Sequence, residues 1–222
     1  MSDVKICGIT CREDAEVAAA AGARYIGAVM YAASPRNTDP DRAKAFSAEL
    51  APELVVVVAD EPASTVVRLA SRSNARVVQL HGAESPETAA VVRSGGPWDV
   101  WKAIRARSGE EVLETIRRFG TVVDGFVVDG WHPRLIGGTG VRVRWDELPG
   151  LAEELPAGAR LIAAGGLTPE NVANVVALAR PHVVDVSSGV EREPGRKDPH
   201  KVRAFVRAVT DHKESARQVD NR

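Results

Sequence analysis

Side chains that can move a proton stand where several short apolar runs of this chain end. The set comprises Cys7, His81, Asp129 and Asp185. A thiolate can take a proton from carbon when nearby positive charge lowers its pKa, and burial raises the pKa of a carboxyl so that it can donate one. Cys7 is therefore a candidate proton acceptor and Asp129 a candidate proton donor.

Each of these residues also has a plainer interpretation. A lone cysteine such as Cys7 is more often a small core residue, and Asp129 could cap a helix or anchor a loop. A hydrogen-bonded histidine at a strand end explains His81 without any chemistry, and a solvated surface arginine explains Arg36 in Ser34-Pro35-Arg36. Arg36 could instead bind a carboxylate through two parallel hydrogen bonds.

Glycine-rich turns form a second set, which could bind phosphate. Closely spaced backbone N–H groups without intervening side chains suit an anion, particularly near the start of a helix. Alone, each turn is a weak signal, but two of them follow the last two predicted strands, where barrels commonly hold a phosphate. The residues are Gly138, Thr139 and Gly140, then Gly165 and Gly166, and finally Ser188 and Gly189.

The elements that carry these residues alternate regularly. Short β-branched runs are typical of buried parallel strands, and Ala-rich amphipathic runs of covering helices. The predicted strands are 4–7, 25–30, 54–59, 76–80, 100–104, 125–129, 160–164 and 183–187. The predicted helices are 12–21, 40–50, 63–73, 86–95, 110–119, 169–179 and 199–210, with a short one near 145–148.

Eight strand–helix units favour a (β/α)₈ barrel, an α/β fold in which the loops after the strands form the catalytic face. The 222 residues and the uniform composition predict a single domain over residues 1–212. Residues 213–222 are polar and lack a core-facing pattern, so a frayed C-terminal tail is expected.

Composition excludes several classes of function. The net charge is −1, no basic stripe suggests nucleic acid, and no apolar run is long enough to cross a membrane. Two cysteines only four positions apart and five scattered histidines predict neither a disulfide framework nor a metal site. We expect a cytoplasmic protein without metal or cofactor; the sequence leaves monomer and homodimer open.

Several segments, in order along nearly the whole chain, resemble phosphoribosylanthranilate isomerase of tryptophan biosynthesis. The most specific are Val4-Lys5-Ile6-Cys7-Gly8-Ile9-Thr10 and Asp185-Val186-Ser187-Ser188-Gly189-Val190-Glu191. Shorter matches are Ser34-Pro35-Arg36, Val78-Gln79-Leu80-His81-Gly82, Gly137-Gly138-Thr139-Gly140 and Ala164-Gly165-Gly166-Leu167. The chain departs from the family pattern at Val143-Arg144-Trp145, where Phe-Asp-Trp is frequent, and at Ala28-Val29-Met30, where aromatic residues are common.

The resemblance implies a cofactor-free Amadori rearrangement of N-(5′-phosphoribosyl)anthranilate to 1-(2-carboxyphenylamino)-1-deoxyribulose 5-phosphate. Asp129 would protonate the ribose ring oxygen and Cys7 would remove the proton at C2′. Arg36 would bind the anthranilate carboxylate, Asp185 would contact the ribose, and His81 would line the site. The phosphate would bind at the three glycine turns.

Two other functions remain open from the sequence. One is a non-catalytic phosphate-binding barrel, although binding alone needs no donor and acceptor on different strands. The other is a sugar isomerase that also accepts a histidine-pathway intermediate. Such enzymes resemble catalysts with two carboxylates, so Cys7 at the end of the first strand argues against this alternative.

Overall fold

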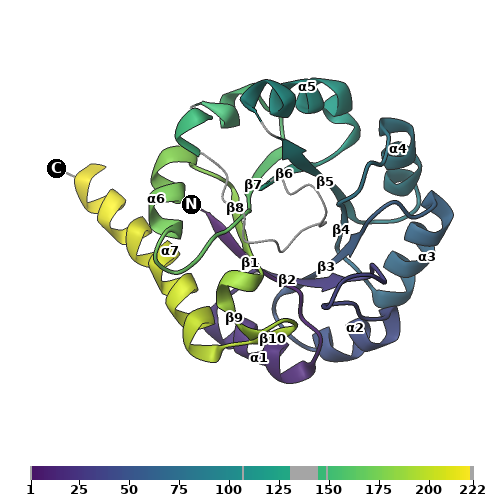
Figure 1. The fold of residues 1–222 in the computed structure, drawn as a ribbon, viewed down its shortest axis with the longest axis horizontal. Helices are drawn as coiled ribbons and strands as arrows, with labels where there is room; N and C mark the ends of the chain where they lie inside the picture. Colours follow the sequence, from purple (N-terminus) through teal and green to yellow (C-terminus); the bar gives the residue numbers. More distant parts are fainter. Residues whose placement is uncertain (1, 107, 131–144, 149, 221–222) are drawn as a thin grey trace.

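The eight predicted strands close into one parallel barrel in this computed structural model, which describes residues 2–106, 108–130, 145–148 and 150–220. Each strand pairs with the next along the chain, and the last pairs with the first. Figure 1 shows the helices arranged around this ring. The predicted (β/α)₈ fold is confirmed.

The strands and helices have the following bounds. The strands are β1 (Asp3–Cys7), β2 (Tyr25–Val29), β3 (Glu53–Val58), β4 (Val77–Leu80), β5 (Asp99–Ala106), β6 (Gly125–Gly130), β7 (Arg160–Ala163) and β8 (Val183–Val186). The helices are α1 (Arg12–Ala21), α2 (Pro40–Ser47), α3 (Ala63–Ser73), α4 (Pro86–Ser94), α5 (Gly109–Phe119), α6 (Val172–Ala179) and α7 (Pro199–Asp220). Short 3₁₀ turns are η1 (Gly120–Val122), η2 (Trp145–Glu147), η3 (Leu151–Glu154) and η4 (Ser188–Val190), and β9 (Glu191–Glu193) with β10 (Arg196–Lys197) forms a small hairpin.

Three helices differ from the prediction by three residues or more, and the first of them, α2, ends at Ser47 instead of Leu50. Helix α6 begins at Val172 instead of Pro169, because the Asn171 side chain accepts from the Thr168 N–H and donates to the Gly166 carbonyl, which fixes a separate turn. Helix α7 continues to Asp220, beyond the predicted end at Thr210, and its last turns extend away from the barrel (Figure 1). Fraying of residues 213–222 stays a prediction.

Buried side chains divide into two layers because successive residues of a strand point to opposite faces. One cluster lies between the barrel and its helices, and a smaller one fills the barrel interior. Trp101 and Tyr25 meet edge to face in this interior, with ring centroids 5.2 Å apart. Cys7 belongs to the same interior cluster, so the residues of β1 that share its orientation also face the inside of the barrel.

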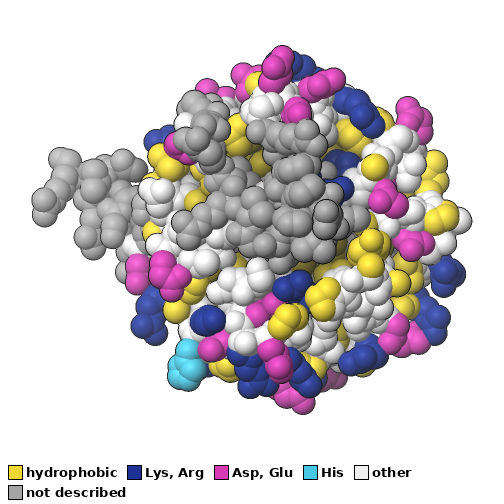
Figure 2. All heavy atoms as spheres, viewed as in Figure 1, with side chains coloured by type: hydrophobic (Ala, Val, Ile, Leu, Met, Phe, Trp, Pro, Cys, Tyr) yellow, Lys and Arg dark blue, Asp and Glu magenta, His cyan; other side chains and the backbone are white. Residues whose placement is uncertain are grey.

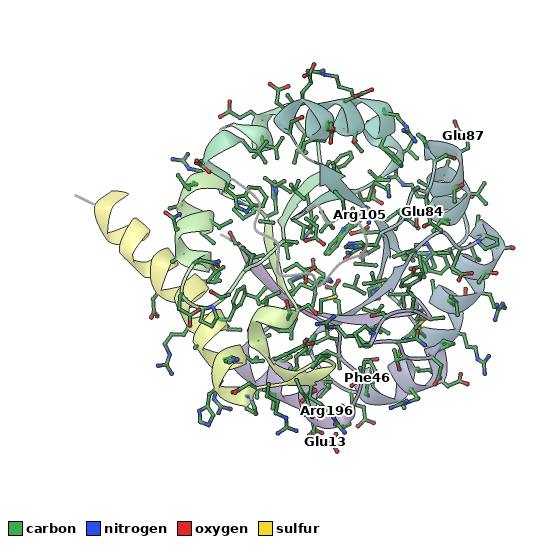
Figure 3. All side chains as sticks on the ribbon, in the orientation of Figure 1. Glu13, Phe46, Glu84, Glu87, Arg105 and Arg196 are labelled. Atoms are coloured by element: carbon green, nitrogen blue, oxygen red, sulfur yellow. The ribbon has the colours of Figure 1, made fainter. Side chains whose placement is uncertain are left out.

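A buried ion pair fixes the segments that follow β3 and β4. Lys102 on β5 donates to Glu84 at 2.8 Å and to the Gly82 carbonyl at 2.7 Å, and both charged side chains are buried. The Glu84 carboxylate also accepts from the N–H groups of Asp60 and Gly82. Figure 3 places Glu84 beside β4, toward α4. The loop that leads away from His81 is therefore held by charge as well as by backbone bonds.

Lys102→Met leaves the Glu84 carboxylate buried without its cation. Breaking a buried pair in this way costs about 3–5 kcal/mol, so we expect a large fall in the free energy of unfolding, measured by urea denaturation. The control is Arg72→Ala, which removes an exposed ion pair with Asp41 and should leave the urea midpoint nearly unchanged. Equal effects of the two changes would contradict this account of the loop.

Candidate active site

The carboxyl ends of the strands surround a cavity of about 730 Å³, including its open mouth. Strands β1, β4, β6 and β8 contribute the polar part of its wall, together with the segment after β2. The predicted residues that line it are Cys7, Arg36, His81, Asp129, Asp185, Gly165, Gly166, Ser188 and Gly189. Figure 2 shows charged side chains of both signs around the visible face of the molecule.

Cys7 lies beside a buried ion pair. Lys5, two residues earlier on β1, donates to Asp185 at 2.8 Å, and both side chains are buried. A Cβ atom at Gly27, on the neighbouring strand β2, would lie 2.8 Å from the Cys7 sulfur and 3.2 Å from the Lys5 ammonium. The thiol and the ammonium therefore share the space beside Gly27.

Burial raises the pKa of the Cys7 thiol, because a thiolate loses its hydration there. The Lys5 ammonium acts in the opposite direction, through its charge and through hydrogen bonding, whereas the Asp185 carboxylate adds to the rise. Burial also acts against the charge of Lys5, but Asp185 and Cys7 outweigh it, so the pKa of Lys5 is raised. Lys5 is thus held as a cation next to the thiol.

Asp129 lies against a histidine on another strand. Its Oδ2 is 3.2 Å from His81 Nε2, outside good hydrogen-bond geometry, and its Oδ1 accepts from the Gly130 N–H at 2.8 Å. The Gln79 amide nitrogen is 2.7 Å from His81 Nδ1. Since an amide NH₂ group only donates, Nδ1 accepts, and a neutral His81 carries its hydrogen at Nε2, toward Asp129.

Arg36 is buried, unlike a solvated surface arginine, and is paired on one side. Its Nε and Nη2 donate to the two carboxylate oxygens of Glu191 at 2.8 and 2.7 Å. Lys197 donates to the same carboxylate at 2.9 Å. Burial acts to raise the pKa of Glu191, but the hydrogen bonds and charges of Arg36 and Lys197 outweigh it and hold the pKa below its ordinary value. The pair uses two guanidinium nitrogens and leaves Nη1 outside it.

Comparison with known proteins connects this geometry to one family. The family model of N-(5′-phosphoribosyl)anthranilate isomerase matches residues 4–208. The curated N-(5′-phosphoribosyl)anthranilate isomerase of Citrifermentans bemidjiense is 42% identical over 208 residues, which are 93% of this chain and 96% of that protein. The chain belongs to the phosphoribosylanthranilate isomerase family.

Solved structures agree with this assignment. A phosphoribosylanthranilate isomerase in complex with reduced 1-(o-carboxyphenylamino)-1-deoxyribulose 5-phosphate has a TM-score of 0.81 at 30% identity, covering 95% of this chain and 100% of that one. A structure of monomers of the dimeric enzyme of Thermotoga maritima has a TM-score of 0.81 at 32% identity, with the same coverage.

Two of the three glycine turns predicted for this isomerase fold lie at the cavity. Gly165 and Gly166 have φ of +78° and +62°, which a side chain rarely adopts. A Cβ atom at Gly189 would overlap the Leu167 carbonyl oxygen at 1.9 Å, so the two loops touch. The third turn, with Gly138, Thr139 and Gly140, lies outside the described residues.

Four residues at or beside the isomerase cavity were missed by the sequence analysis: Lys5, Gln79, Glu191 and Lys197. Lys5 and Gln79 could have been found by alternation, because each precedes a predicted site residue by two positions on the same strand. Glu191 gave no such signal, because Arg36 is 155 positions away along the chain.

Glu191→Gln should make the isomerase less stable at neutral pH by about 3–5 kcal/mol, because Arg36 and the buried Lys197 lose their shared anion. Since the pKa of Glu191 is lowered by folding, its contribution is present above the ordinary glutamate pKa and is lost as the pH falls through the folded value. Urea denaturation from neutral to acidic pH should show a smaller acid loss in the variant; parallel curves would rule this out.

Proposed function

We propose that this chain converts N-(5′-phosphoribosyl)anthranilate to 1-(2-carboxyphenylamino)-1-deoxyribulose 5-phosphate, with Cys7 as the proton acceptor and Asp129 as the proton donor. One observation carries the assignment of roles: a thiol beside a cation and a carboxyl beside a histidine line a single cavity. Family membership supports the reaction itself, an aldose–ketose isomerisation in tryptophan biosynthesis.

The reaction needs two proton transfers at different atoms. Asp129 gives its proton to the ribose ring oxygen as the bond from that oxygen to C1′ breaks, which opens the ring to a protonated Schiff base. The Cys7 thiolate then removes the proton at C2′, and the electron pair moves to form an enolamine. Transfer of the C2′ hydroxyl proton and protonation at C1′ give the ketone. No electrons are gained or lost, so the reaction needs no redox cofactor.

The remaining groups of the cavity suit the ends of this substrate. Arg36, fixed on one side by Glu191, presents its remaining donors to the anthranilate carboxylate. Asp185 Oδ1 is buried without a hydrogen-bond partner among the described residues, so a ribose hydroxyl can donate to it. His81 contacts Asp129 and steadies its carboxylate after the proton has left.

The phosphate is proposed to bind at the turns after β7 and β8. Gly166, Ser188 and Gly189 of these two turns line the cavity. These turns lie where barrels commonly bind phosphate, and left-handed glycines can direct successive N–H groups into one concavity. Gly138, Thr139 and Gly140 are proposed to complete the site.

We further propose that the protein works in the cytoplasm without metal or cofactor, as a monomer or homodimer. A relative from Thermotoga maritima is dimeric, which makes the homodimer a concrete alternative to test by sedimentation. No helix within the described part of the chain could cross a membrane.

Cys7→Ser and Asp129→Asn should each lower kcat/KM by about 10²–10⁴-fold, because each removes one of the two proton-transfer groups. The measurement is the loss of anthranilate fluorescence during turnover, together with growth of a tryptophan auxotroph that lacks this isomerase. Full turnover or normal growth with both variants would overturn the assigned roles.

Cys11→Ser is the matched control for the cysteine. Cys11 is half-buried at the start of α1, where its sulfur accepts from Arg196 at 3.4 Å, and Figure 3 shows Arg196 at the periphery. The control should keep wild-type activity. Incubation with the histidine-pathway substrate, with its product separated by chromatography, tests the dual-substrate alternative, for which we expect no turnover.

A further inference from the structure

Lys5 is a lysine inside the barrel, where a single uncompensated charge is very costly. Its side chain has no exposed surface, and strand register places it directly opposite Asp185 on the neighbouring strand β8. The 2.8 Å bond between their charged groups follows from that register. The proposed proton-transfer mechanism gives this lysine no task.

On the other side of β1, the register with β2 places Cys7 against Gly27. Any side chain at Gly27 would enter the space that the sulfur and the Lys5 ammonium share, with its Cβ at 2.8 and 3.2 Å from them. Glycine thus leaves room for the thiol to approach the ammonium. The residues of β1 and β2 build this contact together.

On this side of the cavity, the cationic side chains outnumber the carboxylates by one. The Lys5–Asp185 pair is neutral, whereas Arg36 and Lys197 share the single carboxylate of Glu191. These two clusters of described residues therefore contain three cations and two carboxylates. Both clusters act on Cys7, because Lys5, Lys197 and Arg36 all interact with it electrostatically. Burial lowers the pKa of Lys197 and raises that of Cys7, so a thiolate that forms at Cys7 during the reaction would balance the cations of these two clusters.

We propose that Lys5 is a positioning residue whose ammonium is the counterion of the Cys7 thiolate as that thiolate forms in the reaction, while Asp185 anchors the ammonium from the other side. The proposal rests on the role of Cys7 as proton acceptor. It assigns to Lys5 the counterion that a desolvated thiolate base needs.

Other titratable groups surround the thiol. Lys5 lies on the same strand, Asp185 on β8, Lys197 on β10 and Arg36 after β2, and His81 and Asp129 line the cavity from β4 and β6. Burial is the largest influence on the thiol and raises its pKa, and Lys5 is the largest influence that lowers it. Lys197 acts in the same direction more weakly. Removal of Lys5 should therefore have the largest effect on the thiol.

The test measures the thiol itself, in a Cys11→Ser background so that Cys7 is the only cysteine. The pH dependence of thiolate ultraviolet absorbance and of iodoacetamide alkylation gives the titration midpoint of Cys7. Lys5→Met should move this midpoint up by about 1–3 pH units, and the acidic limb of the kcat profile should move with it. Lys5→Arg should restore much of the midpoint.

Asp185→Asn should shift the titration midpoint of Cys7 in the opposite direction. It removes the anion that competes with the thiolate for Lys5, so the Cys7 midpoint should move down, although turnover falls because Asp185 also faces the substrate. A purely structural role for the pair would move both midpoints in the same direction or leave them unchanged, and either outcome overturns the proposal. If Lys5→Met does not fold, the Asp185→Asn shift alone decides.

Lys102→Met is the matched control, because Lys102 is also buried and also bonded to a carboxylate at 2.8 Å, but lies on the outer side of β5 near Phe119. It should lower stability and leave the Cys7 midpoint unchanged. The experiment distinguishes the two proposals. If Lys5→Met shifts the Cys7 midpoint but the Cys7→Ser enzyme remains active, the interaction between Lys5 and Cys7 is supported and the proposed role of Cys7 in the reaction is contradicted.

Discussion

Alternation of side chains along closed parallel strands is the constraint on which this site depends. Closure of the barrel leaves an interior that alternate residues must fill, and much of it is filled by apolar side chains such as Trp101 and Val127. Toward the carboxyl ends of the strands the same inward positions carry Lys5, Cys7 and Asp129. The site is thus the polar continuation of the barrel core. Its residues cannot turn outward without a shift of the strand register.

Charges at such positions need partners, because burial of an ion costs several kcal/mol even in a relaxed protein. The chain meets this cost with carboxylates on other strands: Asp185 for Lys5, and Glu191 for Arg36 and Lys197. Lys5 and Asp185 are 180 positions apart and Arg36 and Glu191 are 155 apart, whereas Lys197 and Glu191 are six apart in one hairpin. The two long-range pairs therefore form only when the barrel has closed, and they link β1 to β8 and the segment after β2 to β9. Stability and site geometry share the same contacts.

Sequence patterning was sufficient to predict the barrel because each strand–helix unit is local and the eight units repeat. Strand-end position also selected Cys7, Asp129 and Asp185, which the structure places around one cavity, since the end of a strand can be read without the fold. Partnerships across the barrel could not be predicted in this way. The pairing of Glu191 with Arg36 depends on the hairpin of β9 and β10. The start of α6 depends on which of two possible N-cap residues, Thr168 or Asn171, begins the helix, and the side-chain bonds of Asn171 decide this.

The two sides of the cavity differ in a way that fits two opposite proton transfers. On the Cys7 side, burial raises the pKa of the thiol, and Lys5 and Lys197 act in the opposite direction, which supports the proposed base. The Asp129 side contains a histidine whose Nδ1 accepts from Gln79, so that its Nε2 hydrogen points to the carboxylate. In the proposed mechanism, His81 can donate to the carboxylate that remains after Asp129 has given its proton. Cations beside the thiol and a histidine beside the carboxyl therefore give the proposed base and the proposed acid different surroundings within one cavity.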